Sequence, residues 1–256
     1  MLPTLFISHG SPMLALQPGA SLAPLTRLAR ELPKPKAILV VSAHWESADL
    51  RVTHAAQPQT WHDFYGFPPE LYAVQYPAPG APALAQRVVQ LLGEDGLAAS
   101  LDDQRPLDHG AWVPLSLMYP AADIPVLQLS LPSHLPPALQ QRIGQALRGL
   151  REEDVLLIGS GSITHNLGEL DRRAGPESIQ PWAREFRDWM AARLADEDQA
   201  ALLDYRNQAP WALRNHPRDE HLLPLFFARG AGGSPFVIEH SGFILGALGM
   251  DIYRFG

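Results

Sequence analysis

The stretch AILVVSAHW, residues 37–45, begins as an unbroken apolar run and ends on a histidine and a tryptophan. Continuous runs of aliphatic residues are typical of parallel strands that are buried on both faces. LFISHG (5–10) and DVLLIGSGSITH (154–165) have the same form, with an apolar run, then small residues and a histidine. The three stretches therefore predict buried strands that each lead to a histidine.

Amphipathic stretches alternate with these apolar runs along the whole chain. Apolar residues at helical spacing predict helices, whereas short continuous runs predict strands. The expected helices are 22–32, 81–96, 137–150 and 181–196. The expected strands are 5–8, 37–43, 50–55, 124–130 and 154–162, with two closing strands within 235–253. This alternation predicts an α/β fold with a central, mostly parallel or mixed sheet flanked by helices. Because no repeat or linker interrupts it, residues 1–256 are interpreted as one domain.

Composition excludes several classes of protein and of site. The net charge is −7 and basic residues form no cluster, which argues against a nucleic-acid partner. No apolar run approaches the roughly 20 residues of a membrane span, and no signal peptide is evident. The chain has no cysteine, so a disulfide, a thiolate metal site and a cysteine nucleophile are excluded. These features favour a cytoplasmic protein.

The histidines at the strand ends are the first candidates for chemistry. In open α/β sheets, ligands bind outside the carboxyl ends of the strands. If the three strands are parallel and adjacent, His9, His44 and His165 point into one crevice. Small neighbours leave room for a ligand beside each imidazole. A fourth candidate, His221, follows an Asp-Glu pair ahead of a predicted helix.

Each histidine also has an ordinary structural interpretation. A single histidine at a strand end more often makes a structural hydrogen bond than binds a metal, but repeated placement favours metal binding for His9 and His44. His109 precedes an apolar helix, where it could line the site or cap the helix. The remaining histidines are interpreted as surface or loop residues: His54, His62, His134, His216 and His240.

Other catalytic motifs are absent from the sequence. The GSGS at 159–162 lacks the lysine of a phosphate-binding P-loop, and isoleucine at 158 breaks the pattern of a serine-hydrolase elbow. No H-E-x-x-H zinc motif occurs. One apolar stripe on the helix at 181–196 is interpreted as core packing: Trp182, Phe186, Trp189 and Met190.

Six separated segments resemble, in the same order, those of the class III extradiol ring-cleavage dioxygenases. They span nearly the whole chain and are most similar to the branch of DOPA 4,5-dioxygenase-like proteins. The segments are SHGSPM (8–13), VVSAHW (40–45), HDFYGFPPELYAVQYPAPG (62–80), LDHGAWVPL (107–115), GSGSITHNL (159–167) and EHLLPL (220–225).

The resemblance implies one non-haem divalent metal, with His9, His44 and His221 as ligands. It implies that His165 is an acid/base beside the metal, or a fourth ligand without substrate, and that His109 lies against the substrate. Protocatechuate-type relatives use two histidines and a carboxylate, which Glu220 could supply here. Two histidines with a carboxylate favour Fe(II), whereas three histidines suit Zn(II) at least as well.

The implied reaction inserts O₂ into a catechol and opens the ring to a muconic semialdehyde, which requires Fe(II). The expected partners are a small aromatic diol and O₂, with the protein a monomer or a small homo-oligomer. A zinc hydrolase on the same scaffold and a non-catalytic binding protein remain alternatives. Five aromatic residues could form the wall of a substrate pocket, although ordinary packing is the commoner role of each: Trp45, Phe64, Tyr65, Phe67 and Tyr72.

Overall fold

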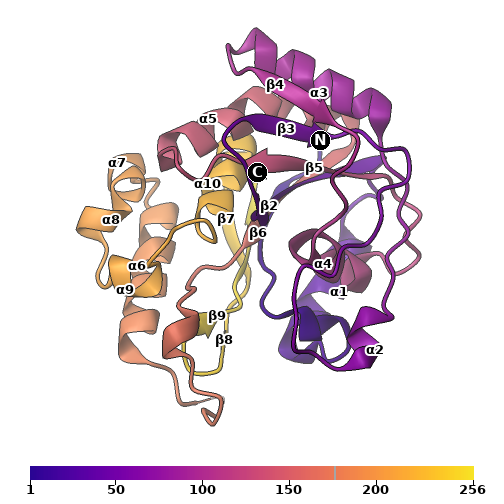
Figure 1. Ribbon diagram of the computed structural model, residues 1–256. Coiled ribbons are helices and arrows are strands. Elements are labelled where there is room, and N and C mark those ends of the chain that lie inside the picture. The colour runs from indigo at the N-terminus through magenta and orange to yellow at the C-terminus, as the bar shows by residue number, and fades with distance from the viewer. Residues whose placement is uncertain (176) are drawn as a thin grey trace.

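The computed structural model describes residues 1–175 and 177–256. An eight-stranded sheet crosses the centre of the molecule in the order β4-β3-β5-β2-β6-β1-β10-β7 (Figure 1). Its strands are β1 (Thr4–Ser8), β2 (Ala37–Glu46), β3 (Leu50–Thr53), β4 (Ala99–Asp102), β5 (Val126–Leu131), β6 (Val155–Gly161), β7 (Phe236–His240) and β10 (Ile252–Phe255). A second sheet pairs β8 (Phe243–Ile244) with β9 (Leu248–Gly249).

The centre of the large sheet is parallel. Strands β5, β2, β6 and β1 run in one direction, with Val40 opposite Gln128 on one side and Ile158 on the other. Strands β3 and β4 are parallel to each other but antiparallel to β5, and β10 and β7 add antiparallel pairs beyond β1. The predicted α/β fold with a mostly parallel or mixed sheet is therefore confirmed.

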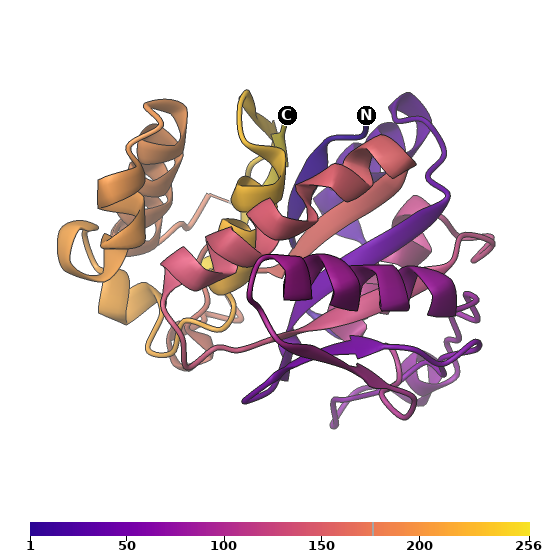
Figure 2. The same ribbon diagram turned by 90° about the horizontal axis from the view of Figure 1, so that it is seen from above.

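Helices cover both faces of this sheet (Figures 1 and 2). Because successive residues of a strand point to opposite faces, Leu39 and Val41 pack into one apolar core and Ile38 and Val40 into another. Helices α3, α5 and α10 cover the first face, and α1 and α4 cover the second. The main helices are α1 (Leu22–Glu31), α3 (Pro82–Glu94), α4 (His109–Met118), α5 (Pro137–Leu147), α6 (Pro181–Ala195) and α10 (Leu223–Gly232). The shorter helices are α2 (Pro69–Tyr72), α7 (Gln199–Leu203), α8 (Tyr205–Gln208) and α9 (Ala212–Asn215).

Several predicted helices begin at a proline. Pro82, Pro137 and Pro181 each occupy the first turn, where the missing N–H would have no partner within the helix. The apolar stripe of α6 is in the core as predicted, with Phe186 and Met190 fully buried. Among the described residues, none of the helices is both long and apolar enough to cross a bilayer.

The C-terminal segment from residue 235 onward differs from the prediction of two closing strands. It contains four strands, β7 to β10, because positive φ angles at Leu245 and Gly246 make a tight turn that separates β8 from β9. Strands β7 and β10 extend the large sheet, while β8 and β9 form a small hairpin. The short strand β4 and the helices α7, α8 and α9 were not predicted.

Candidate metal centre and substrate pocket

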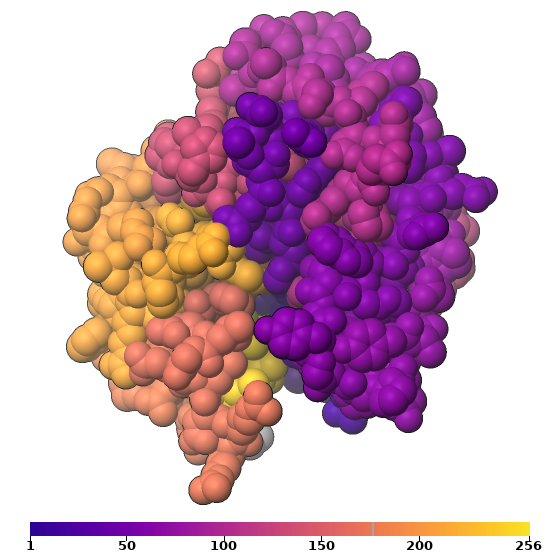
Figure 3. Space-filling model, viewed as in Figure 1, coloured from indigo at the N-terminus to yellow at the C-terminus, as the bar shows by residue number. Residues whose placement is uncertain are grey.

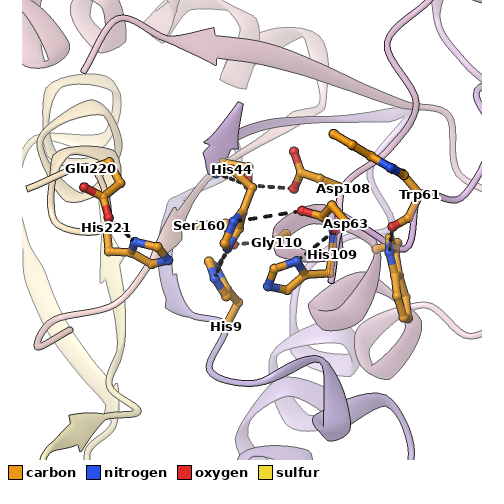
Figure 4. A network of polar contacts seen from close by, with 12 residues as sticks. His9, His44, Trp61, Asp63, Asp108, His109, Gly110, Ser160, Glu220 and His221 are labelled. Carbon is orange, nitrogen blue, oxygen red and sulfur yellow. Dashed lines mark hydrogen bonds and ion pairs between the residues drawn. The ribbon is translucent and has the colours of Figure 1, made fainter. Parts of the chain in front are cut away.

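The strands that carry the candidate histidines are neighbours in the sheet. Strand β6 lies between β2 and β1, and all three are parallel, so their carboxyl ends meet at one edge. His9 directly follows β1, His44 lies near the end of β2, and His165 follows β6. The structure therefore brings together side chains that lie far apart in the sequence, and Figure 4 shows His9, His44 and His221 pointing toward one another.

His221 reaches this edge from the turn that precedes α10. Its carbonyl oxygen accepts a hydrogen bond of 2.8 Å from the backbone N–H of Ser162, just beyond β6. A Cβ atom on Gly161 would lie 2.0 Å from that same oxygen. Only glycine allows this close approach, so the end of β6 fixes His221 next to the other histidines.

His9, His44 and His221 form a compact group. Each can offer one ring nitrogen, and these three nitrogens lie within 4.8 Å of one another. The Nε2 atoms of His9 and His44 are 3.0 Å apart. Two nitrogens bound to one divalent ion at about 2.1 Å are separated by a similar distance, so the spacing fits a shared metal.

Hydrogen bonds fix which nitrogens carry lone pairs. The hydroxyl of Ser160 donates to the carbonyl of Gly110 and therefore accepts the Nδ1–H of His9, at 2.9 Å. The Nδ1–H of His221 donates to Glu220 at 2.9 Å. Both rings, if neutral, then have unprotonated Nε2 atoms. A metal-ligating histidine commonly donates its other N–H to a carboxylate or another acceptor in this way.

The histidines are held in their neutral form. Burial lowers the pKa of His9 and His221 well below the ordinary value, and neighbouring histidines lower it further. Burial also lowers the pKa of His44 and of His165 to about 4. At neutral pH these imidazoles are uncharged, which is the form that binds a divalent metal.

His109 is the first residue of α4 and does not lie in a loop ahead of it. Asp63 Oδ1 accepts both the backbone N–H of His109, at 3.0 Å, and its ring Nδ1–H, at 2.9 Å. Burial alone would raise the pKa of Asp63, but these hydrogen bonds hold it below the ordinary value. Its other oxygen lies 3.9 Å from His44 Nδ1. Asp63 thus orients His109 and faces His44; sequence reasoning missed it, although it belongs to the 62–80 segment.

A second missed carboxylate, Asp108, lies behind His44. It is fully buried and accepts hydrogen bonds from Ser42, Gln128 and Arg105. Arg105 also donates to the carbonyl of His44 at 2.8 Å. These contacts fix the backbone around His44, and no local pattern in the sequence indicates them.

The ring of His165 stacks on that of His221, with centroids 3.5 Å apart and planes 8° from parallel. His165, Glu220 and His221 form a second group whose ligand atoms lie within 4.8 Å of one another. The position of His165 is compatible with either expected role, an acid/base or a fourth ligand.

A cavity of about 670 Å³ opens over these histidines. Figure 3 shows it as a hollow between the purple N-terminal half and the salmon and yellow C-terminal segments. Of the five aromatic candidates, only Phe64 and Phe67 line it. Trp45 is buried beneath Arg105, and Tyr65 is 93% exposed. The lining residues are Gly10, Ser11, Pro12, His44, Phe64, Phe67, His109, His165, Leu167, Leu170, Arg172, His221, Leu245 and Leu248.

Comparison with known proteins decides the family. Residues 3–256 match the family described as the catalytic LigB subunit of aromatic ring-opening dioxygenase. The chain belongs to this family. The chain is 42% identical to the 4,5-DOPA dioxygenase extradiol of Beta vulgaris, over 98% of this chain and 96% of that protein. It is also 42% identical to the 4,5-DOPA dioxygenase extradiol of Escherichia coli K12, over 100% of this chain and 95% of that protein. A crystal structure of an uncharacterized protein from Escherichia coli K12 has a TM-score of 0.85 at 36% identity and 100% coverage of both chains.

The other histidines of this dioxygenase lie outside the metal-capable group His9, His44 and His221. His216 is in a loop, as predicted, but it is not at the surface: it is fully buried and bonds to the carbonyl of Ile163 at 2.9 Å. Its burial follows from the packing of the loop behind His165, which the sequence does not reveal. His134 is exposed, and His54, His62 and His240 are partly exposed.

Acidification from pH 7 to pH 5 is expected to destabilise the metal-free dioxygenase. Burial lowers the pKa of His216 to about 3, against 6.5 in the unfolded chain. Below pH 6.5 the unfolded state therefore binds the proton first, so stability present above that pH is lost as the pH falls. By pH 5, His216 alone should lower the free energy of unfolding by on the order of 2 kcal/mol.

Denaturant unfolding at pH 7, 6 and 5 in the presence of a chelator tests this expectation. The free energy of unfolding of His216→Gln should depend less steeply on pH than that of the unchanged protein. The comparison uses the pH slope alone, since the substitution also changes the absolute stability. Parallel slopes would contradict a buried, neutral His216.

Proposed function

We propose that residues 1–256 act as one catalytic unit that opens a catechol ring by extradiol cleavage, with Fe(II) held by His9, His44 and His221. One observation carries the proposal: neutral histidines converge at the base of a largely apolar cavity whose volume of about 670 Å³ accommodates an aromatic ring and a side chain. The DOPA dioxygenase names of the relatives support a DOPA-like catechol as substrate.

The metal site suits Fe(II) or Zn(II) by its ligands alone, because imidazole binds both. When bound there, Fe(II) supplies the redox chemistry that the reaction of a catechol with O₂ requires, which Zn(II) does not have. We therefore propose Fe(II) in the active enzyme and expect zinc-loaded protein to bind the catechol without turnover.

Two histidines are proposed to move protons. His165 is neutral at pH 7, since burial lowers its pKa to about 4, and can accept a proton from a catechol hydroxyl. His109 donates its Nδ1–H to Asp63, so in its neutral form its Nε2 has a lone pair available to a second hydroxyl. Asp63 fixes this tautomer in the same way that a buried carboxylate orients a catalytic histidine in other enzymes.

The apolar walls serve the same reaction by holding the ring and excluding water. Phe64 and Phe67 contact each other edge to face, with centroids 5.2 Å apart, and Phe64 also packs edge-on to His109 at 5.8 Å. Aromatic side chains in such arrangements form a rigid surface against which a flat substrate can pack. A dry cavity also protects reactive intermediates from water.

The relatives bear dioxygenase names, which favours this function over a zinc hydrolase or a binding protein. We keep three further predictions from the sequence as part of the proposal. They are a cytoplasmic location, a monomer or small homo-oligomer, and no nucleic-acid or membrane partner.

Oxygen uptake tests the proposed function. The protein is stripped of metal, loaded with Fe(II) without air, and mixed with DOPA or another catechol in aerated buffer. We expect one O₂ consumed per yellow ring-opened product, and no uptake by zinc-loaded protein. Turnover by the zinc form without oxygen would instead identify a hydrolase, and no uptake with any catechol at full iron loading would refute the dioxygenase.

A further inference from the structure

One charged side chain in the substrate cavity has no part in the proposed chemistry. Arg172 lines the cavity together with apolar residues of the same wall, Leu170 and Leu245. Within residues 1–175 and 177–256, Arg172 makes no ion pair and no side-chain hydrogen bond. Most other arginines of this acidic protein are paired with a carboxylate, so a guanidinium without a partner at a binding cavity is notable.

The backbone around Arg172 is held in place. The N–H of Asp171 donates to the carbonyl of Leu245 at 2.9 Å, and the N–H of Ala174 donates to the carbonyl of Asp171 at 3.1 Å. The side chain of Asp171 also accepts the N–H of Arg173 at 2.8 Å. This turn contacts the turn of the β8–β9 hairpin, and Arg172 and Leu245 both line the cavity.

The side chains that line the cavity include a positive charge but no negative charge. Its lining includes the guanidinium of Arg172 and four histidines, but no aspartate or glutamate. Arg172 is exposed, so its guanidinium is accessible to a ligand in the cavity. A guanidinium binds a carboxylate through paired N–H donors. An ammonium group on a ligand would meet no opposite charge here and would be repelled by Arg172.

We infer that Arg172 is a specificity-determining residue that binds a carboxylate on the side chain of the catechol, and that a side-chain ammonium is not recognised. The preferred substrates are then dihydroxyphenyl compounds with a carboxylate-bearing side chain. The histidines receive the two hydroxyls, and Arg172 receives the carboxylate. This inference rests on the proposed function for its catalytic part, but binding can be measured separately.

Four catechols separate the contributions of the two charges. DOPA has a carboxylate and an ammonium, 3-(3,4-dihydroxyphenyl)propanoate only the carboxylate, dopamine only the ammonium, and 4-methylcatechol neither. For the iron-loaded protein, kcat/KM should be highest for the propanoate. It should be about 10-fold or more lower for dopamine than for DOPA. Equal kcat/KM for dopamine and DOPA would overturn the inference.

Arg172→Ala should lower the ratio of kcat/KM for the propanoate to kcat/KM for 4-methylcatechol by about 10-fold, and Arg172→Lys should restore part of it. Arg173→Ala is the matched control, because Arg173 is the adjacent arginine and is exposed like Arg172, but does not line the cavity. A ratio that stays constant in Arg172→Ala, or falls equally in Arg173→Ala, would refute the role of Arg172.

Titration calorimetry on zinc-loaded protein gives a readout without turnover. The Kd for the propanoate should rise about 10-fold in Arg172→Ala and stay constant in Arg173→Ala. If this binding result is obtained while iron-loaded protein consumes no oxygen, the proposed function fails and the inference about Arg172 stands. If oxygen is consumed but the Kd is the same in all variants, the inference fails and the function stands.

Discussion

Replacing His9 with alanine is expected to abolish stable metal binding and to lower the rate of oxygen uptake by at least about 1,000-fold. His9 directly follows β1 and is buried, with its Nδ1–H held by Ser160 at 2.9 Å. Its Nε2 is 3.0 Å from that of His44. Removing the ring takes away one of the three neutral nitrogens that can hold the metal.

Metal content after dialysis, measured by elemental analysis, is the direct readout, and oxygen uptake is the second. His134→Ala is a suitable control because His134 lies in the loop after β5 and does not line the cavity. Circular dichroism should show that both variants fold. A folded His9→Ala protein that retains one metal per chain would contradict the assignment of His9 as a ligand.

Replacing His165 with alanine is expected to preserve metal binding while lowering kcat by about 100- to 10,000-fold, the range typical of losing an acid/base catalyst. His165 stacks on His221 at 3.5 Å, so it lies beside the metal-capable group without being one of its three members. Its pKa of about 4 means that it is neutral and can accept a proton at pH 7.

Metal content and kcat are to be measured on the same preparation of His165→Ala. Equilibrium binding of a catechol to the zinc-loaded variant would show whether the pocket is intact. Loss of both metal and activity would instead identify His165 as a fourth ligand. Its ring nitrogen lies close enough to Glu220 and His221 for that role. Full activity in the variant would leave His109, held by Asp63, as the proton acceptor.

The alternation of apolar runs and amphipathic stretches was sufficient to predict the α/β fold, because buried parallel strands need aliphatic residues on both faces. Element ends were predicted well where proline or glycine marks them, as at Pro137 and Pro181. The 235–253 segment was predicted less well, since its division into β7, β8, β9 and β10 depends on a turn at Leu245 and Gly246 and on pairing with β1.

The strand-end positions of His9, His44 and His165 could be read from the sequence alone, and the EHLLPL segment (220–225) identified His221 as a further candidate. The hydrogen bonds that hold these histidines in place became visible in the three-dimensional structure. Asp63 and Asp108 lie in segments that the sequence analysis singled out, but their contacts with His109 and Ser42 join distant parts of the chain, and no local pattern identifies Arg172.

The burial of His216 and the exposure of Tyr65 were likewise fixed by packing between distant segments. The physical reason is that periodicity reports which side of an element faces the core, and therefore predicts elements and the edge of the sheet where ligands bind. Hydrogen bonds, burial and charge pairing between loops depend on three-dimensional contacts that a single sequence does not encode locally.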